Sequence, residues 1–215
     1  MAQVKEDTPS EKMFEHQLGI NASRFLSSVL RVTDPLDGSP YDFNYKLLYR
    51  TDPEKMYFSS VGLRFGAGWI LDNMESSNPV AQTAFTRSFK IFDMRAGVEA
   101  QKQLSKYWTA YAGLDYVGKS GTDETQNTFI SGGVQRTSIT SEKDRAEGGG
   151  AILGIQFNAS KHICLSTEVS YYFFKGNRDS YQDSGFPGSQ VQWRHEKYSR
   201  SEITSPFFIN FNFRF

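Results

Sequence analysis

The sequence predicts an all-β protein, an eight-stranded antiparallel up-and-down transmembrane β-barrel, from three observations. Eight segments alternate apolar with polar residues, as strands with one apolar and one polar face do. Short and long connections alternate between these segments. The last nine residues, 207–215, form such a segment and end on Phe215, whereas chain ends are usually polar and frayed. A terminal strand of this kind needs a partner on each edge and an apolar medium against one face.

The connections between the segments follow a strict rhythm. The expected strands are 14–29, 41–50, 57–69, 85–99, 107–118, 148–157, 162–175 and 200–215. The short connections are 51–56, 100–106 and 158–161, and the long ones are 30–40, 70–84, 119–147 and 176–199. Up-and-down order then places all short turns at one end and all long loops at the other, as in outer-membrane barrels.

The apolar residues of each expected strand share one face. Leu18, Ile20 and Ala22 do so in the first strand. The third strand, 57–69, has about twelve steps of 3.3 Å, which at a tilt of about 40° span roughly 30 Å, the depth of a bilayer core. In other strands this face carries Phe43, Tyr45 and Leu47; Phe92 and Met94; Ala110, Ala112 and Leu114; and Leu165, Val169, Tyr171 and Phe173.

Aromatic residues near the strand ends suit the headgroup zone of a membrane, where an amphipathic ring is half hydrated. We expect this interfacial role for Tyr41, Tyr49, Tyr57, Trp69, Trp108 and Tyr116. In the terminal strand, the apolar face consists of Phe207, Ile209, Phe211, Phe213 and Phe215, with Asn210, Asn212 and Arg214 opposite.

The same alternation fits a soluble barrel of the lipocalin kind, with its apolar face turned inward. Side-chain volume separates the two cases, because the interior of an eight-stranded barrel is only wide enough for its side chains to fill it. About five bulky residues per strand would overfill that space. The opposite face is rich in glycine, including Gly62, Gly66, Gly97 and Gly154. We therefore expect the apolar face to point outward, into lipid.

Composition excludes several classes of protein. The 24 basic and 24 acidic residues leave no net charge to favour a nucleic-acid partner. The single Cys164 permits no internal disulfide, and no run approaches the roughly 18 apolar residues of a membrane helix. The mean hydropathy of −0.52 looks soluble, but aromatics make up 15% of the chain, and only alternate barrel residues touch lipid.

The start of the chain lacks the apolar core of a signal peptide, so we interpret the sequence as the mature form of an exported protein. Residues 1–13 are charged and contain proline, and we expect them to form a periplasmic tail that is too short to fold alone. Residues 14–215 are expected to form the barrel. The predicted location is the outer membrane of a Gram-negative bacterium.

The alternating strands, the loop asymmetry and the terminal Phe-Asn-Phe-Arg-Phe resemble small outer-membrane barrels of the OmpA/OmpX type, over about residues 14–215. This resemblance implies that the last strand carries the signal read by the barrel-assembly machinery. The segment from Tyr111 to Tyr116 is also similar to barrels of Bacteroidetes-type bacteria.

The polar face of the strands predicts a charged but neutral lumen. The residues that strand parity places there are Asp42, Lys46, Arg50, Arg64, Asp93, Arg95, Glu99, Asp115, Glu168 and Arg214. Buried charges persist when paired, because desolvating one alone costs several kcal/mol. We expect a salt-bridge network that plugs the barrel. A narrow pore is the alternative, although a selective ion pathway favours rings of one sign.

Two cations break the parity and fall on the lipid-facing side, Arg24 in the first strand and Lys90 in the fourth. Long cationic side chains near a membrane surface can snorkel or contact the phosphates of lipopolysaccharide. For Arg24, a bulge that reverses the register explains the position equally well.

No catalytic residue, metal site or cofactor is predicted. Lipid-modifying barrels need a histidine beside a serine and an orienting carboxylate. His16 and His162 are expected at the short-turn rim, and His195 in a long loop without the His-x-Ser-Asn pattern of the lipid A deacylase family. Residues 179–185 lack the glycine and glutamate of an EF-hand loop. Gly148–Gly150 is expected to be a flexible entry to the sixth strand rather than a phosphate loop.

These observations favour a non-enzymatic outer-membrane barrel that acts through its loops or through a partner. The candidate roles are a structural or surface-binding protein and an accessory subunit of an outer-membrane export, uptake or assembly complex. A lipid-modifying enzyme remains the alternative. Residues 128–135 are candidates for a hairpin that rises above the membrane, since an exposed strand edge can pair with a partner. The expected partners are outer-membrane lipid, lipopolysaccharide, the assembly machinery and a larger complex.

Overall fold

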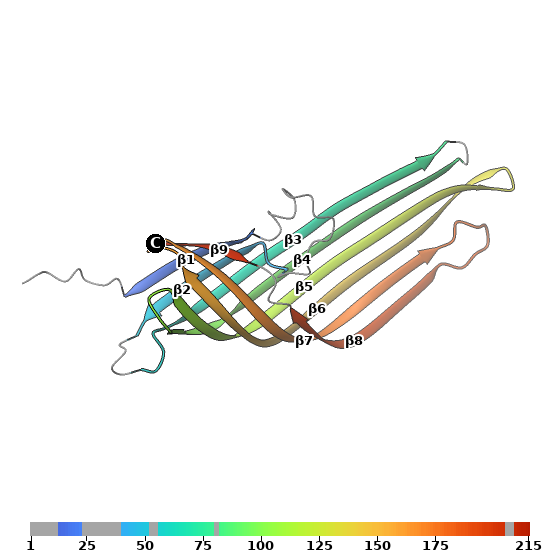
Figure 1. The fold of residues 1–215 in the computed structure, drawn as a ribbon. Helices are drawn as coiled ribbons and strands as arrows, with labels where there is room; N and C mark the ends of the chain where they lie inside the picture. The colour runs from blue at the N-terminus through green and yellow to red at the C-terminus, as the bar shows by residue number, and fades with distance from the viewer. Residues whose placement is uncertain (1–12, 23–39, 52–55, 80–81, 205–208) are drawn as a thin grey trace, which may run out of the picture.

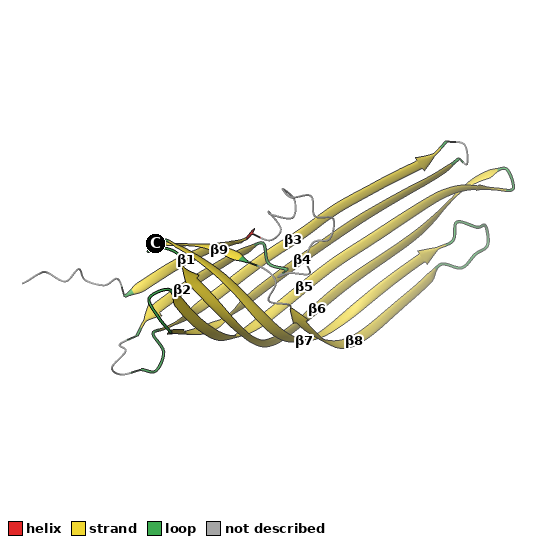
Figure 2. Ribbon diagram, viewed as in Figure 1, coloured by secondary structure: helices red, strands yellow, loops and turns green. Residues whose placement is uncertain are grey.

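The computed structural model describes residues 13–22, 40–51, 56–79, 82–204 and 209–215, which are almost entirely β-strand (Figures 1 and 2). The strands are β1 (Phe14–Asn21), β2 (Phe43–Arg50), β3 (Ser60–Asn78), β4 (Thr83–Gln103), β5 (Trp108–Ser131), β6 (Val134–Asn158), β7 (Ile163–Asp183), β8 (Gln192–Thr204) and β9 (Asn210–Arg214). The expected tail, Arg24 and Phe207 lie outside the described residues.

At the end of the molecule where the C-terminus lies, eight antiparallel strands, β1 to β7 and β9, form a closed ring. The terminal strand β9 closes it, because Phe213 pairs with Leu18 of β1 on one side and with Ile163 of β7 on the other. The final residue continues this pairing, since the Phe215 and His16 backbones exchange hydrogen bonds of 3.0 and 3.2 Å. The sequence prediction of an eight-stranded up-and-down barrel is thus confirmed, with the C-terminal strand removing the open edge.

Five strands of the ring, β3 to β7, continue far beyond it, and β8 joins them there. Strands β3 to β8 form a long curved sheet on one side, while β1, β2 and β9 stay short (Figure 1). The strand β5 has 24 residues, and at about 3.3 Å per residue this exceeds what a bilayer core requires. Between the described residues, β3 beyond Trp69 pairs only with β4, and β8 pairs only with β7. We call this six-stranded part the extension.

The extension corrects three loop predictions. Segments 70–84, 119–147 and 176–199 are largely paired strand rather than loop, and 128–135 forms the predicted hairpin. The tip of that hairpin is Gly132-Gly133, both with positive φ, which suits a two-residue turn. The polar, Ser- and Thr-rich composition of these segments concealed the strands, because both of their faces are hydrophilic and apolar alternation is absent.

The eighth expected strand, 200–215, is described as two pieces. The strand β8 begins earlier, at Gln192, and pairs with the upper half of β7, whereas β9 pairs with its lower half. Ser170 of β7 pairs with Thr204 of β8, whereas Ser166 of β7 pairs with Asn210 of β9. The register therefore shifts by two residues between β8 and β9, and parity is kept. The Gly148–Gly150 run lies inside β6 instead of at its entry.

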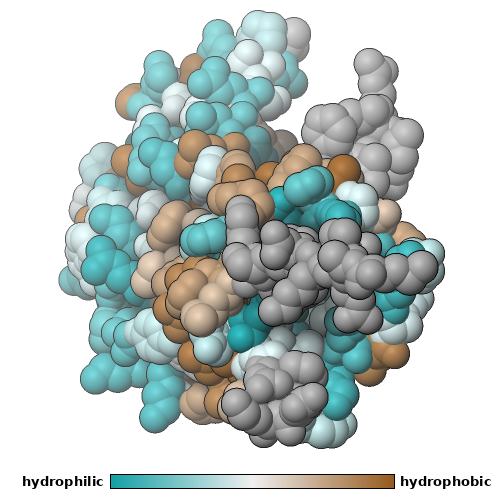
Figure 3. All heavy atoms as spheres, turned by 90° about the vertical axis from the view of Figure 1, so that its left-hand side faces the viewer, coloured by the Kyte–Doolittle hydropathy of each residue, from teal (hydrophilic) through white to brown (hydrophobic). Residues whose placement is uncertain are grey.

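The outer surface of the ring is apolar and its interior is polar, as the volume argument predicted. Leu63, Val98 and Leu114 are exposed, while the residues that follow them in the chain, Arg64, Glu99 and Asp115, are buried. Viewed from the end where the C-terminus lies, hydrophobic residues gather on the flank of the molecule beside hydrophilic ones (Figure 3). No helix among the described residues is long and apolar enough to cross a membrane.

The expected interfacial aromatics divide into two groups. Tyr41 is wrongly predicted, because it is buried and only 2% exposed. Residues 40–42 come before β2 begins, so strand parity does not extend to them. Tyr41 is buried, and the Arg95 guanidinium lies over its ring. The remaining five are at least 41% exposed on the outer surface: Tyr49, Tyr57, Trp69, Trp108 and Tyr116.

Glycines in the ring make room for large lumen side chains. An added Cβ at Gly154 would overlap the ring of Tyr111, and one at Gly97 would overlap the carboxylate of Asp115. Gly121, in the extension, is different, since its nearest neighbour would lie 3.8 Å from an added Cβ. Packing in the ring therefore requires glycine at positions 154 and 97, whereas an alanine would fit at Gly121.

We predict that Gly154→Ala destabilises the barrel by about 1–3 kcal/mol, because Tyr111 must move to admit the methyl group. Gly121→Ala is the matched control and should change stability by no more than about 0.5 kcal/mol. Urea unfolding in detergent micelles, followed by tryptophan fluorescence, measures both. Equal stability of the two variants would show that the lumen is loosely packed.

Candidate functional site

The lumen of the ring holds a network of charged side chains contributed by five strands. Three cations and four carboxylates are buried there, and all were predicted from strand parity: Lys46, Arg64 and Arg95, with Asp93, Glu99, Asp115 and Glu168. The antiparallel register brings them together, since Lys46 pairs with Arg64 across β2 and β3, and Gly66 pairs with Arg95 across β3 and β4.

Glu168 of β7 is the centre of the network. Its carboxylate accepts hydrogen bonds from Arg64 Nη2 at 2.9 and 3.0 Å and from Arg95 Nη1. The hydroxyl of Tyr111 also donates to Glu168 Oε2 at 3.2 Å. One carboxylate thus joins β3, β4, β5 and β7 across the interior. Charge-assisted bonds of this type are about twice as strong as neutral ones.

Glu99 and Asp115 complete the pairing of the two arginines. Glu99 accepts from Lys46 Nζ at 2.9 Å and from Arg64 Nη1 at 3.1 Å. Asp115 Oδ1 lies 3.3 Å from Arg64 Nε. It also accepts a 2.8 Å hydrogen bond from the Tyr172 hydroxyl. Each buried cation therefore faces at least one carboxylate, which offsets the loss of hydration.

Aromatic rings fill the space beside the charges. The Lys46 ammonium lies 4.0 Å from the centroid of the Tyr111 ring, and the Arg95 guanidinium lies 4.4 Å from that of Tyr41. These tyrosines belong to a buried cluster with Val117, Ala146, Ile152, Tyr172 and Phe174. Tyr111 and Tyr172 were not predicted as members of the site, although their parity with Gly113 and Glu168 placed them on the inner face. Charges and rings together pack the interior.

Three of the predicted lumen residues lie at the rims of the ring instead. Asp42 accepts a hydrogen bond from the Trp69 backbone at 3.0 Å, at the edge where β3 leaves the ring. Arg50 is exposed and lies 3.2 Å from Glu15, while Arg214 bonds the other oxygen of Glu15 at 3.1 Å. Glu15 was not predicted. Parity gives the face of a residue and not its height, so strand ends were counted as interior.

The inner face of the extension continues the pattern of paired charges. Arg87 Nη2 lies 2.6 Å from Asp123, Lys119 lies 2.5 Å from Glu202, and Arg178 lies 2.8 Å from Glu142. These residues share the parity of Arg95, Asp115 and Glu168. The hydrogen bonds from Arg87 lower the pKa of Asp123.

The histidines are separated from one another and from the lumen. His16 Nδ1 lies 2.8 Å from the Tyr45 hydroxyl, and His162 lies near the Arg214 carbonyl, both at the short-turn rim as predicted. His195 is in β8 rather than in a loop, and its Nδ1 lies 2.6 Å from Asp179 Oδ1. Among the described residues, no group of three or more His, Cys, Asp or Glu side chains is arranged to hold a metal ion.

The fold and the site define a class, an eight-stranded antiparallel β-barrel with an apolar outer face and a lumen packed by charged and aromatic side chains. A comparison with models of protein families finds no match, and a comparison with curated proteins finds none either. Among solved structures, the chain is similar to the crystal structure of Acinetobacter baumannii CarO. The two share 12% identity with a TM-score of 0.36, over 94% of this chain and 97% of the other.

We predict that Glu168→Gln destabilises the barrel by about 3–5 kcal/mol, because it leaves Arg64 and Arg95 with too little buried negative charge. Glu196→Gln is the control, since Glu196 forms an exposed pair with Arg194, and its loss should cost less than about 1 kcal/mol. The midpoint of heat-induced mobility change in gel electrophoresis reports both. A Glu168→Gln midpoint equal to that of the control would refute the central role of this carboxylate.

Proposed function

We propose that this protein is an integral outer-membrane β-barrel that conducts no ions and acts through its extension as a surface-binding protein. The packed lumen is the observation that carries the proposal. The side chain of Arg64 is 1% exposed and that of Glu99 is 0% exposed. Such an interior leaves the barrel wall and the extension as the parts able to meet a partner.

The outer surface supports a membrane location. Residues Leu63, Leu114, Leu153 and Ile203 are between 46% and 73% exposed, which in water would leave a large apolar area uncovered. Exposed aromatics stand at the short-turn end, among them Tyr57 and Trp108, as at a membrane interface. The OmpA/OmpX type, the Bacteroidetes origin and an assembly signal in Ile209, Phe211, Phe213 and Phe215 remain predictions.

The surroundings of His195 favour a non-enzymatic role. Asp179 of β7 pairs with His195 of β8 on one side and with Lys143 of β6 on the other, so its cross-strand partners are a histidine and a lysine rather than a serine. A catalytic triad needs the histidine between the serine and the carboxylate. Both His195 and Asp179 are more than half exposed, which is unsuited to chemistry that requires water to be excluded.

A second candidate role is that of an accessory subunit of an outer-membrane complex. The observation in its favour is a pair of sheet edges, formed by residues 70–77 of β3 and 192–204 of β8. Within the described residues, each of these segments pairs with a neighbouring strand on one side only. Such edges can accept a strand from another protein. Extraction in mild detergent with identification of co-purifying proteins separates the two roles, because only a stable subunit co-purifies at a fixed ratio.

We predict that the purified protein gives no stable unit currents in planar bilayers, because the lumen is filled. Replacing two buried rings, Tyr111→Ala with Tyr172→Ala, should open a water path and produce measurable conductance. Tyr57→Ala with Tyr107→Ala removes two exposed rings and serves as the control. Regular ion-selective currents from the unmodified chain would overturn the proposal.

A further inference from the structure

We infer that the outer face of strands β6, β7 and β8 binds the phosphorylated headgroup of a membrane glycolipid, with phosphate on a basic row and sugars on an aromatic platform above it. This inference rests on the proposed function, because it requires the apolar wall below to lie in a membrane. It assigns a ligand class to a surface that the lumen network does not use.

The basic row lies directly above the apolar wall. Phe173 faces outward, and Lys175 lies on the same face because it is two residues, or about 7 Å, further along β7. Across the sheet, Lys175 pairs with Glu147 and Ser199, and the next row joins Arg145, Asn177 and Lys197. These six side chains surround a surface groove of about 470 Å³. Phosphates of a lipid headgroup occupy the same height relative to their acyl chains.

The cations of this row are available for a ligand. Within the described part of the chain, Arg145, Lys175 and Lys197 form no ion pair, whereas inner-face Arg178 and Arg200 on the same strands each contact a carboxylate. The nearby acid Glu147 is held by the Tyr116 hydroxyl, which donates to it at 2.7 Å. Three unpaired cations around one groove are complementary to a phosphate.

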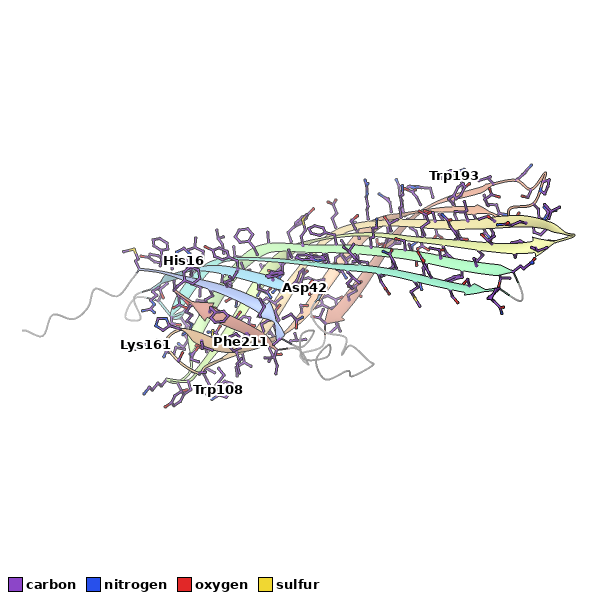
Figure 4. All side chains as sticks on the ribbon, turned by 90° about the horizontal axis from the view of Figure 1, so that it is seen from above. His16, Asp42, Trp108, Lys161, Trp193 and Phe211 are labelled. Carbon is purple, nitrogen blue, oxygen red and sulfur yellow. The ribbon has the colours of Figure 1, made fainter. Side chains whose placement is uncertain are left out.

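An aromatic platform stands higher on the same face. Tyr181 lies six residues beyond Lys175, roughly 20 Å along the strand. Its ring meets Trp193 edge to face at 4.7 Å, and Trp193 is 75% exposed. These rings, with Ser141, Asp179 and His195, line a second groove of about 570 Å³. Figure 4 places Trp193 on the extension, far from Trp108 and Lys161 at the short-turn end.

The order of these features selects the occupant. Going outward along β7, the apolar wall comes first and the basic row second. The aromatic platform comes third, with polar side chains that can form hydrogen bonds to hydroxyl groups. A glycolipid presents acyl chains, phosphate and sugars in the same order, and sugar rings offer apolar C–H faces to aromatic rings. Lys90 on β4 is also exposed on the outer face, and it lies in the cross-strand row that runs through Thr122 and Lys143 to Asp179.

The test measures binding to the detergent-solubilised full chain by native mass spectrometry. The probes are a disaccharide-bisphosphate glycolipid with a short oligosaccharide, the same lipid without the oligosaccharide, and the same lipid without phosphates. We expect Lys175→Gln/Lys197→Gln to weaken both phosphorylated probes about tenfold or more, since two charge-assisted contacts are lost. Trp193→Ala should weaken only the probe that carries the oligosaccharide, by about fivefold.

The control is Lys106→Gln/Lys161→Gln, which removes the same charge from exposed lysines at the opposite end and should leave binding unchanged. Equal weakening by the two double variants overturns the phosphate site, as does inorganic phosphate competing at the affinity of the lipid. Unchanged oligosaccharide binding in Trp193→Ala overturns the sugar platform. A chain that fails to insert into bilayers contradicts the proposed function, whereas normal insertion with unchanged binding contradicts this inference alone.

Discussion

The ion pairs between Glu168 and the two arginines Arg64 and Arg95 are the interaction on which the ring depends. Each arginine alone in this interior would cost several kcal/mol, and the shared carboxylate offsets the cost for both. Because the partners come from β3, β4 and β7, they can pair only when the ring has closed in the correct register. A slip of one residue would turn the charges toward lipid.

The narrow interior explains why this ring tolerates such large polar side chains. Glycines at Gly66, Gly97 and Gly154 leave space on one strand for an arginine, an aspartate or a tyrosine on the next. Large and small side chains therefore alternate across neighbouring strands, and the result is a packed polar core surrounded by an apolar wall. The arrangement inverts that of a soluble barrel, although the sequence period is the same.

Above the ring, the sheet is no longer closed, and its two faces have different charge patterns. The inner face keeps its cations paired, as Lys119 with Glu202 and Arg178 with Glu142 illustrate. On the outer face, Arg145, Lys175 and Lys197 lie in adjacent positions above an apolar wall. The same strands thus carry paired charges on one face and, among the described residues, cations without an ion pair on the other. This division is the reason why we propose the extension, rather than the lumen, as the functional surface.

The sequence by itself determined the strand faces, the short turns after β4 and β6, the closing terminal strand and seven lumen charges. A period of two fixes the side of every residue in a regular strand. Only the tertiary structure decided the height of each residue and the partners of each charge. Asp42, Arg50 and Tyr41 were misplaced for this reason, since they lie where strands begin, end or bend. The extension was hidden as well, because a sheet wetted on both faces leaves no apolar alternation to detect. Its pairing comes from backbone hydrogen bonds across the sheet, and these depend on which strands become neighbours.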